Sequence, residues 1–270
     1  MATNPSGTMQ PLTGLRLIEA CEAARREPAL LRPLALLAAA LPECDRNTLL
    51  EQTLGERNRA LLALRALSFG PELEGYAECG ACGAPMTFRL AVEDALVALD
   101  ACAASATSEW VENGTAWRLR QATTADLLAA ARMPDDALAE RELLRRCLGA
   151  SVMYGANASA GAEADTNAST NANANANVAI LPQTPPSALA EFERLHAGAE
   201  LHCALRCPQC GHAADHELDL ADFVWREARH AARRLLTDIH TLASHYGWSE
   251  AAIAAMSQAR RDAYLELLDA

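Results

Sequence analysis

Apolar residues recur every three or four positions along most of this chain, a spacing typical of helices that pack on a core. Near the N-terminus the pattern is clear, with Leu15, Ile18, Cys21 and Ala24 on one face and Thr13 placed to cap them. The pattern predicts a helix there and a protein built mainly from helices.

Several later stretches carry the same spacing, bounded by residues that favour helix ends. We expect Pro28 to open a helix that Pro42 ends, and Gly247 to end the longest helix, which begins at Asp222. The other predicted helices cover residues 58–67, 92–104, 123–128, 134–148, 187–195, 249–256 and 257–268, with caps at Thr123 (paired with Asp126), Ser187, Ser249 and Ser257.

Three short hairpins supply the predicted strands. One has Asn113-Gly114 at the centre of Trp110–Leu119, which is the strongest short-range hairpin signal. The other two surround Cys-x-x-Cys-Gly turns at Cys79–Gly83 and Cys207–Gly211.

The two thiol turns belong to a longer repeated unit. A shift of 128 positions, from 79 to 207, places Cys79 on Cys207 and Cys82 on Cys210 without a gap. The same shift superimposes further identical residues, namely Leu67 on Leu195, Gly70 on Gly198, Glu72 on Glu200, Leu73 on Leu201, Leu90 on Leu218 and Asp94 on Asp222. Each copy is predicted to form a strand, a thiol turn, a second strand and the start of a helix.

The paired thiol turns predict a metal site. One turn offers two thiolates to a tetrahedral ion, and two turns complete the four-thiolate shell of a structural zinc site. We therefore expect Cys79, Cys82, Cys207 and Cys210 to bind one structural Zn²⁺ per chain. The predicted fold class is α+β, predominantly helical, with two duplicated β-hairpin zinc knuckles forming one zinc-ribbon-like site.

Other uses of the thiols remain open on the sequence alone. Two separate redox dithiols are an alternative, although the chain has no nearby βαβ pattern of thioredoxin type. Cys203 pairs with Gly75 under the shift, which favours a buried thiol over a ligand. His212 follows the second knuckle and could replace a thiolate, but the first copy has Ala84 at that place.

Composition and charge limit the cellular compartments and the classes of partner that we expect for this chain. A formal net charge of −12 and a pI near 5.0 argue against non-specific binding of nucleic acid. Nine cysteines, an odd number, favour metal ligands and buried thiols over a disulfide framework. We find no secretion signal and no apolar stretch that could cross a bilayer, so we expect a cytoplasmic protein without membrane contact.

The chain is predicted to form one composite domain closed by the shared zinc. Residues 1–10 form a flexible tail, and residues 11–150 hold the N-terminal helices, the first knuckle and the Asn113-Gly114 hairpin. Residues 154–180 are rich in Asn and Ala, with almost nothing to bury, and are predicted to be a disordered linker. Residues 181–270 hold the second knuckle and the C-terminal helices.

The C-terminal segment resembles a known family. Asp238–Ile253, with its Tyr246-Gly247-Trp248 turn, and the closing Arg260–Leu268 are similar to the end of the baseplate hub assembly chaperones of contractile-tailed phages and related contractile injection systems. The Arg57-Asn58 helix, the Phe69-Gly70 step and the two thiol units also resemble members of that family. The resemblance covers nearly the whole chain outside the first ten residues and the Asn/Ala-rich segment.

This resemblance implies a non-enzymatic chaperone or minor component that binds baseplate hub or wedge proteins and can be incorporated in the baseplate. Tyr246 and Trp248 are then candidate partner contacts, although packing of the last helices explains them equally well. We recognise no catalytic motif in the sequence. A zinc-ribbon nucleic-acid binder or transcription regulator is the first alternative function, and a dithiol redox sensor is the second.

One basic face stands out in this acidic chain. Arg226, Arg229, Arg233 and Arg234 follow helical spacing on the predicted long helix. Either an acidic partner or plain solvation of a helix face accounts for them.

Overall fold

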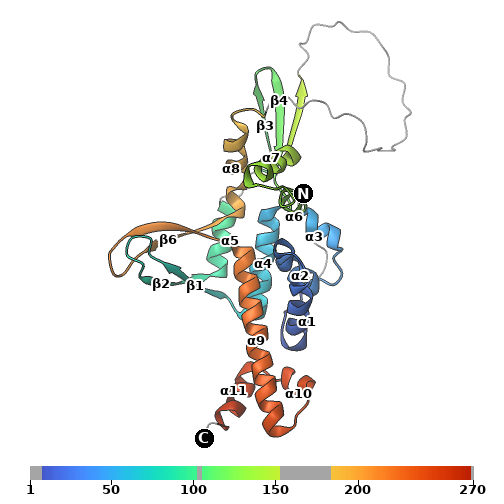
Figure 1. Cartoon of the computed structure of the whole chain (residues 1–270), viewed down its shortest axis with the longest axis vertical. Coiled ribbons are helices and arrows are strands. Elements are labelled where there is room, and N and C mark those ends of the chain that lie inside the picture. The colour runs from blue at the N-terminus through green and yellow to red at the C-terminus, as the bar shows by residue number, and fades with distance from the viewer. Residues whose placement is uncertain (1–7, 102–104, 153–183, 269–270) are drawn as a thin grey trace, which may run out of the picture.

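The computed structural model describes residues 8–101, 105–152 and 184–268. It shows an α+β protein in which helices are joined to three small antiparallel sheets, which confirms the predicted class. Figure 1 shows an elongated molecule with a sheet at one end, the C-terminal helices at the other and two hairpins projecting together from one side. The predicted linker at 154–180 and residues 1–7 of the predicted tail lie outside the described residues.

The N-terminal half of the core is helical. It contains α1 (Gly14–Arg25), α2 (Arg32–Ala40), α3 (Arg46–Glu51) and α4 (Leu54–Phe69), with a short 3₁₀ turn at Ala29–Leu31. Leucine and alanine side chains of these helices meet the first half of α9 (Leu220–Tyr246) in one buried cluster that includes Leu17, Leu36, Leu61 and Ala228. Segments far apart in the sequence therefore share one core.

Helix α4 begins four residues before the predicted start at Asn58. Thr53 and Glu56 form a capping box, in which the Glu56 N–H donates to the Thr53 hydroxyl and the Thr53 N–H donates to the Glu56 carboxylate at 2.9 Å. The box supplies partners for two amides that have no acceptor within the helix because they lie at its start, and it helps the helix begin although Gly55 is a weak helix former.

The two repeated units have the same structure. Strands β1 (Glu72–Glu78) and β2 (Pro85–Ala91) pair in one hairpin, and β6 (Leu201–Arg206) and β7 (Ala213–Leu218) pair in the other. Helix α5 (Val92–Ala101) follows the first hairpin and α9 follows the second. Leu73 pairs with Leu90 and Leu201 with Leu218, so the registers agree under the 128-residue shift.

The two copies pack against each other through equivalent side chains. Leu73 and Val92 of the first copy meet their counterparts Leu201 and Leu220 in one buried cluster, to which Leu62 of α4 contributes. This cluster brings both hairpins to the same side of the molecule, where Figure 1 shows them together.

The sheet at the far end has one strand more than predicted. Strands β3 (Thr107–Glu112) and β4 (Thr115–Arg120) form the predicted hairpin, and its turn residues Asn113 and Gly114 have φ of 51° and 72°. Strand β5 (Leu148–Val152) then pairs with β4. Helix α7 (Asp136–Cys147) ends one residue before the predicted end at Leu148, because Leu148 takes extended backbone and pairs with Leu119.

Helices α6 (Thr124–Ala130) and α8 (Ala188–His196) support this sheet. The predicted box of Thr123 and Asp126 is confirmed, and the buried Asp126 carboxylate also accepts from Arg120 at 2.6 Å and from Arg146 at 2.8 Å. The caps at Thr13 and Ser187 are wrong in one respect: both residues precede their helices, but neither side chain accepts a capping hydrogen bond. The Ser187 hydroxyl donates to the Glu112 carboxylate instead.

The C-terminal helices follow the prediction closely. Helix α9 starts two residues before the predicted Asp222, with Asp219 as its cap, and ends at Gly247, which has a left-handed φ of 69°. Ser249 and Ser257 cap α10 (Glu250–Ala254) and α11 (Gln258–Glu266) with their hydroxyls. Across the described ranges, none of the helices combines the length and apolar character needed to span a bilayer.

Candidate metal centre

Each hairpin ends in a thiol turn that the backbone closes in the same way. The Cys79 N–H donates to the Ala84 carbonyl at 2.9 Å, and the Gly83 N–H donates to the Cys79 carbonyl at 2.8 Å. The second turn repeats both bonds, from Cys207 to His212 at 2.8 Å and from Gly211 to Cys207 at 3.0 Å. The glycine φ values, 71° and 74°, are in the left-handed region, which explains why a glycine follows each cysteine pair.

The two turns bring all four predicted thiols together. The Cys79 sulfur lies 3.6 Å from that of Cys210, and the Cys82 sulfur lies 3.7 Å from that of Cys207. All four ligand atoms lie within 4.8 Å of one another. Each of these two pairs joins one hairpin to the other, as a shared site requires.

The distances fit a metal better than disulfides. A disulfide bond is about 2.0 Å long, well below the observed separations. A tetrahedral ion with bonds of about 2.3 Å to sulfur separates its sulfurs by about 3.8 Å. Four soft sulfur donors at these spacings therefore suit a tetrahedral metal of zinc type.

The surroundings of the thiols divide into a buried and an exposed half. Cys79 and Cys207, the first cysteine of each turn, are 3% and 2% exposed and pack with Ala84 and Met86. Cys82 and Cys210, the second of each turn, are exposed. The site thus lies at the tip of the paired hairpins, with its inner half sealed by a small apolar cluster.

The thiols influence each other's protonation. The pKa of Cys79 is lowered to about 6, first by the backbone N–H groups of Cys82 and Ala81, which donate to its sulfur. The backbone N–H of Ala84 favours the Cys82 thiolate, but hydrogen bonds to Cys210 and the other cluster thiols, together with partial desolvation, outweigh it and raise the pKa of Cys82 to about 12. A cation at the centre removes this conflict, since it favours the thiolate form of every ligand.

The other candidate ligands lie outside the cluster. Cys203 sits in mid-strand opposite His216, and His212 is exposed. The buried thiols Cys21 and Cys147 belong to other parts of the core. Within the ranges that the structure describes, no second group of three or more Cys, His, Asp or Glu side chains brings its ligand atoms this close together.

The surface around the thiols is acidic. Eight carboxylates on the two hairpins and the adjoining helix starts are all exposed: Glu72, Glu74, Glu78, Glu93, Asp94, Asp215, Glu217 and Asp219. Arg89 and Arg206 are the arginines on the four strands, and Arg89 already pairs with Glu74 at 2.9 Å. Such a surface repels phosphate and does not favour a nucleic-acid-binding ribbon.

The candidate partner contacts, Tyr246 and Trp248, lie at the opposite end of α9 from its hairpin. Their rings stack at 4.5 Å, and the ring of Tyr264 meets them edge-on at 5.8 and 4.8 Å. Trp248 is packed against the buried cluster of Ile239, Leu242 and Ile253. The rings therefore join the last helices, and Tyr246 remains 36% exposed.

The structure also contains a buried ion pair that the sequence analysis missed. Asp238 lies on the apolar face of α9 between Leu235 and Ile239, and its carboxylate accepts from Arg261 of α11 at 3.1 Å. A carboxylate on an apolar helix face signals a buried cation, because an unpaired charge there is costly. The sequence could not show which arginine supplies it.

Comparisons with protein-family models, with curated proteins and with solved structures find no match for this chain.

Proposed function

We propose that this chain is a non-enzymatic protein-binding factor in the assembly of a contractile tail or injection-system baseplate, either as a chaperone or as a minor component. The closed four-thiol cluster carries the proposal. Four thiolates fill a tetrahedral shell and leave no position for water or substrate, so the metal has a structural role. The resemblance of Asp238–Ile253 and Arg260–Leu268 to baseplate hub assembly chaperones supports the process.

The proposed metal is one Zn²⁺ held by Cys79, Cys82, Cys207 and Cys210 in a zinc-ribbon-like site. Zinc prefers four thiolates in a tetrahedron and takes part in no redox step of its own. Bound there, it joins the two hairpins and so fixes the helices of both repeated units relative to one another. The protein-binding surface is then on those helices, and the factor acts in the bacterial or host cell cytoplasm or is incorporated in the baseplate.

The partner is tested by co-purification of the tagged full chain from cells that also carry the neighbouring tail genes. The proposal predicts recovery of a baseplate hub or wedge protein, identified by mass spectrometry. Recovery of nucleic acid in its place, or of neither, contradicts the proposal. Elemental analysis of the same preparation identifies the metal, and iron in place of zinc would redirect the account toward redox chemistry.

A further inference from the structure

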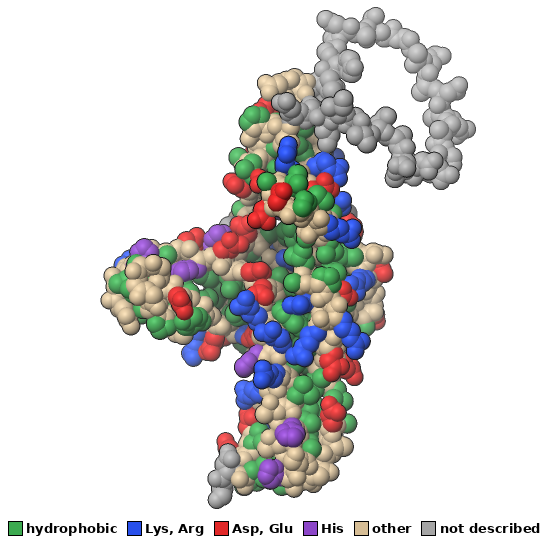
Figure 2. All heavy atoms as spheres, viewed as in Figure 1, with side chains coloured by type: hydrophobic (Ala, Val, Ile, Leu, Met, Phe, Trp, Pro, Cys, Tyr) green, Lys and Arg blue, Asp and Glu red, His purple; other side chains and the backbone are tan. Residues whose placement is uncertain are grey.

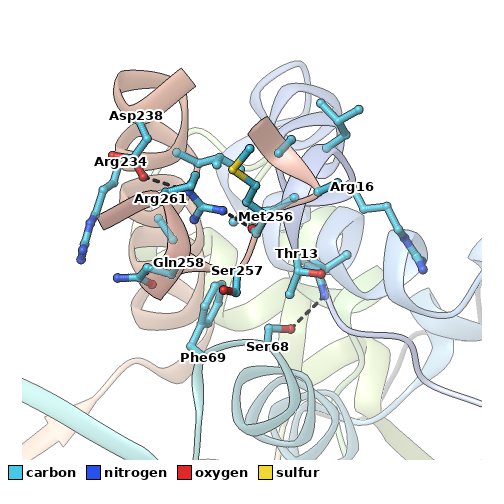
Figure 3. Close-up of a pocket in the computed structure, with 18 of the residues that line it drawn as sticks. Thr13, Arg16, Ser68, Phe69, Arg234, Asp238, Met256, Ser257, Gln258 and Arg261 are labelled. Carbon is cyan, nitrogen blue, oxygen red and sulfur yellow. Dashed lines mark hydrogen bonds and ion pairs between the residues drawn. The ribbon is translucent and has the colours of Figure 1, made fainter. Parts of the chain in front are cut away.

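A groove with a volume of about 860 Å³ lies between the start of α1, the middle of α9 and the start of α11 (Figure 3). The buried charges in its wall are already paired, since Arg261 donates to the Asp238 carboxylate at 3.1 Å. Figure 3 also shows the bond from Arg261 to the Met256 carbonyl, at 2.6 Å. This groove therefore has no buried charge that is free to select a ligand.

A smaller pocket, with a volume of about 190 Å³, has a buried arginine in its wall. It lies between α4, α7, α8 and the residues that flank the second hairpin, and the arginine is Arg57 of α4. Arg57 is 8% exposed, and among the described residues no carboxylate oxygen lies within 4.0 Å of its guanidinium. Burial lowers the pKa of Arg57, and the more distant Asp219 offsets this only in part. A buried positive charge without a direct partner is costly, so it indicates a place for an anionic group.

The orientation of the Arg57 guanidinium is fixed by Asn58. The Asn58 Oδ1 accepts from Nε and Nη2 of Arg57 at 3.1 and 3.0 Å, and the Asn58 amide donates to the Ala199 carbonyl at 2.7 Å. A guanidinium has five N–H donors, so the remaining donors are on Nη1 and Nη2. Nη1 has no acceptor among the described residues. This free end of the guanidinium matches the two oxygens of a carboxylate.

The mouth of the pocket carries the opposite charge. Glu200, Glu217 and Asp219 line the pocket and are exposed. Figure 2 shows acidic side chains gathered where the paired hairpins meet the helices. His196 also lines the pocket, but both of its ring nitrogens are hydrogen-bonded to backbone groups, so it adds no charge. A purely anionic ligand is opposed at this mouth, whereas a ligand that also carries a cation is attracted there.

The remaining walls of the pocket are apolar. They are formed by Leu54, Leu143, Phe192, Leu218 and Leu220. The volume is below the range of about 300–1,000 Å³ typical of drug-sized ligands. The pocket therefore suits a ligand the size of a single amino acid, with an apolar side chain.

We propose that this pocket binds an apolar α-amino acid as a zwitterion. The ligand carboxylate accepts from the free end of Arg57, and the ligand ammonium faces Glu200 and Glu217. The ligand side chain contacts Phe192 and the leucines of the wall. No part of this site depends on the thiol cluster or on a baseplate partner, so it is a function beyond the one proposed above.

The test measures the affinity of the full metal-loaded chain for three related probes by saturation-transfer nuclear magnetic resonance. L-Leucine carries both charges, N-acetyl-L-leucine lacks the ammonium, and L-leucinamide lacks the carboxylate. We expect L-leucine to bind at least about tenfold more tightly than either other probe, because each of them lacks one charge-assisted contact.

Three variants locate the binding site. Arg57→Lys is expected to weaken L-leucine binding by at least about tenfold, because lysine keeps the charge but lacks the planar fork. Glu200→Gln with Glu217→Gln is expected to weaken it by at least about threefold. The control, Glu72→Gln with Glu74→Gln, changes the net charge equally at exposed positions of the first copy and is expected to change binding by less than about twofold. Circular dichroism and zinc content confirm that each variant is folded.

Four outcomes overturn the proposal. They are no binding of L-leucine to the natural chain, equal binding of L-leucine and either other probe, full affinity in the Arg57→Lys variant, and equal weakening by the two glutamine pairs. The Glu200→Gln, Glu217→Gln variant alters only exposed side chains, so it tests the site even if the buried substitution at Arg57 disturbs folding.

Discussion

Gly83 and Gly211 show how closely the two thiol turns match at the level of single residues. Both have a left-handed φ, and an added Cβ at either position meets no atom within 4 Å. Substitution there is therefore opposed by backbone strain and not by a clash. Gly80, in the first turn, also has open space around its Cβ position but lacks the left-handed φ.

Alanine at position 83 or 211 is therefore expected to weaken metal binding. The left-handed conformation costs a non-glycine residue about 1–2 kcal/mol, which corresponds to roughly a five- to thirtyfold loss of zinc affinity. Competition with a chromophoric chelator measures the loss. Gly80→Ala is the control, and an equal loss in that variant would show that strain at the left-handed glycine is not the cause.

His196 is a second residue whose effect on stability can be measured, because its protonation makes stability depend on pH. Its Nε2 accepts from the Ala122 N–H at 2.6 Å, and its Nδ1 donates to the Phe192 carbonyl at 2.7 Å, so the folded protein holds the ring neutral. Burial is the main reason that the pKa of His196 is lowered in the folded state. The unfolded chain binds the proton more readily, so this contribution to stability is complete above a pH of about 6.5 and is lost as the pH falls toward the folded pKa.

His196→Gln is expected to flatten the dependence of stability on pH. Between pH 7.5 and 5.5 the natural chain should lose up to about 1.4 kcal/mol more unfolding free energy than the variant, because glutamine has no proton to take up. Urea denaturation at the two pH values measures both slopes. Identical slopes would show that His196 is protonated at little cost in the folded protein.

At the scale of helices and strands, α4 and α9 join the first repeated unit to the second. The Arg65 guanidinium is buried and donates to both carboxylate oxygens of Glu227, at 2.9 and 2.8 Å. The Asn58 amide donates to the Ala199 carbonyl at 2.7 Å, just before β6. These contacts connect residues 141 and 162 positions apart, so they form only when both units are folded.

Glu227→Ala is expected to destabilise the protein by about 1.5–3 kcal/mol, because it leaves the buried Arg65 without its carboxylate. Arg226→Ala on the same helix removes an exposed pair with Asp222 and is expected to cost less than about 0.5 kcal/mol. Chemical denaturation of both variants tests the difference. Similar losses would mean that Arg65 finds water or another acceptor when Glu227 is absent.

Much of this architecture could be predicted from the sequence because its signals are local. The apolar spacing of α1 and α9, the Asn113-Gly114 turn, the glycine stop at Gly247 and the caps at Ser249 and Ser257 all act within a few residues. The 128-residue shift also predicted the four thiols of the cluster, because equivalent turns form equivalent hairpins. These elements were predicted correctly in kind, with ends displaced by a few residues.

The features that were missed depend on partners distant in the sequence. Strand β5 is short and directly follows a helix, so its identity depends on the free edge of β4. The partners of Asp238 and Arg65 lie 23 and 162 positions away, and nothing near either residue identifies them. The Ser187 hydroxyl donates to Glu112 instead of capping its own helix, and that partner is also distant in the sequence.

At the scale of the whole molecule, the paired hairpins connect the N-terminal helices to the C-terminal helices. Equivalent leucines of the two copies share one buried cluster, and the thiols meet beyond it at the hairpin tips. Neither copy holds four ligands alone, so a metal bound there couples the two halves thermodynamically.

We propose that both thiol turns bind one shared metal, and the zinc content per chain tests this directly. The full chain is purified without added metal and analysed by inductively coupled plasma mass spectrometry alongside Cys79→Ser, Cys207→Ser and the control Cys203→Ser. A shared site predicts about one zinc per chain in the natural protein and the control, and loss of most of it in both other variants. Two zinc ions per natural chain, or zinc retained after either knuckle is broken, would show that the two turns do not share one metal.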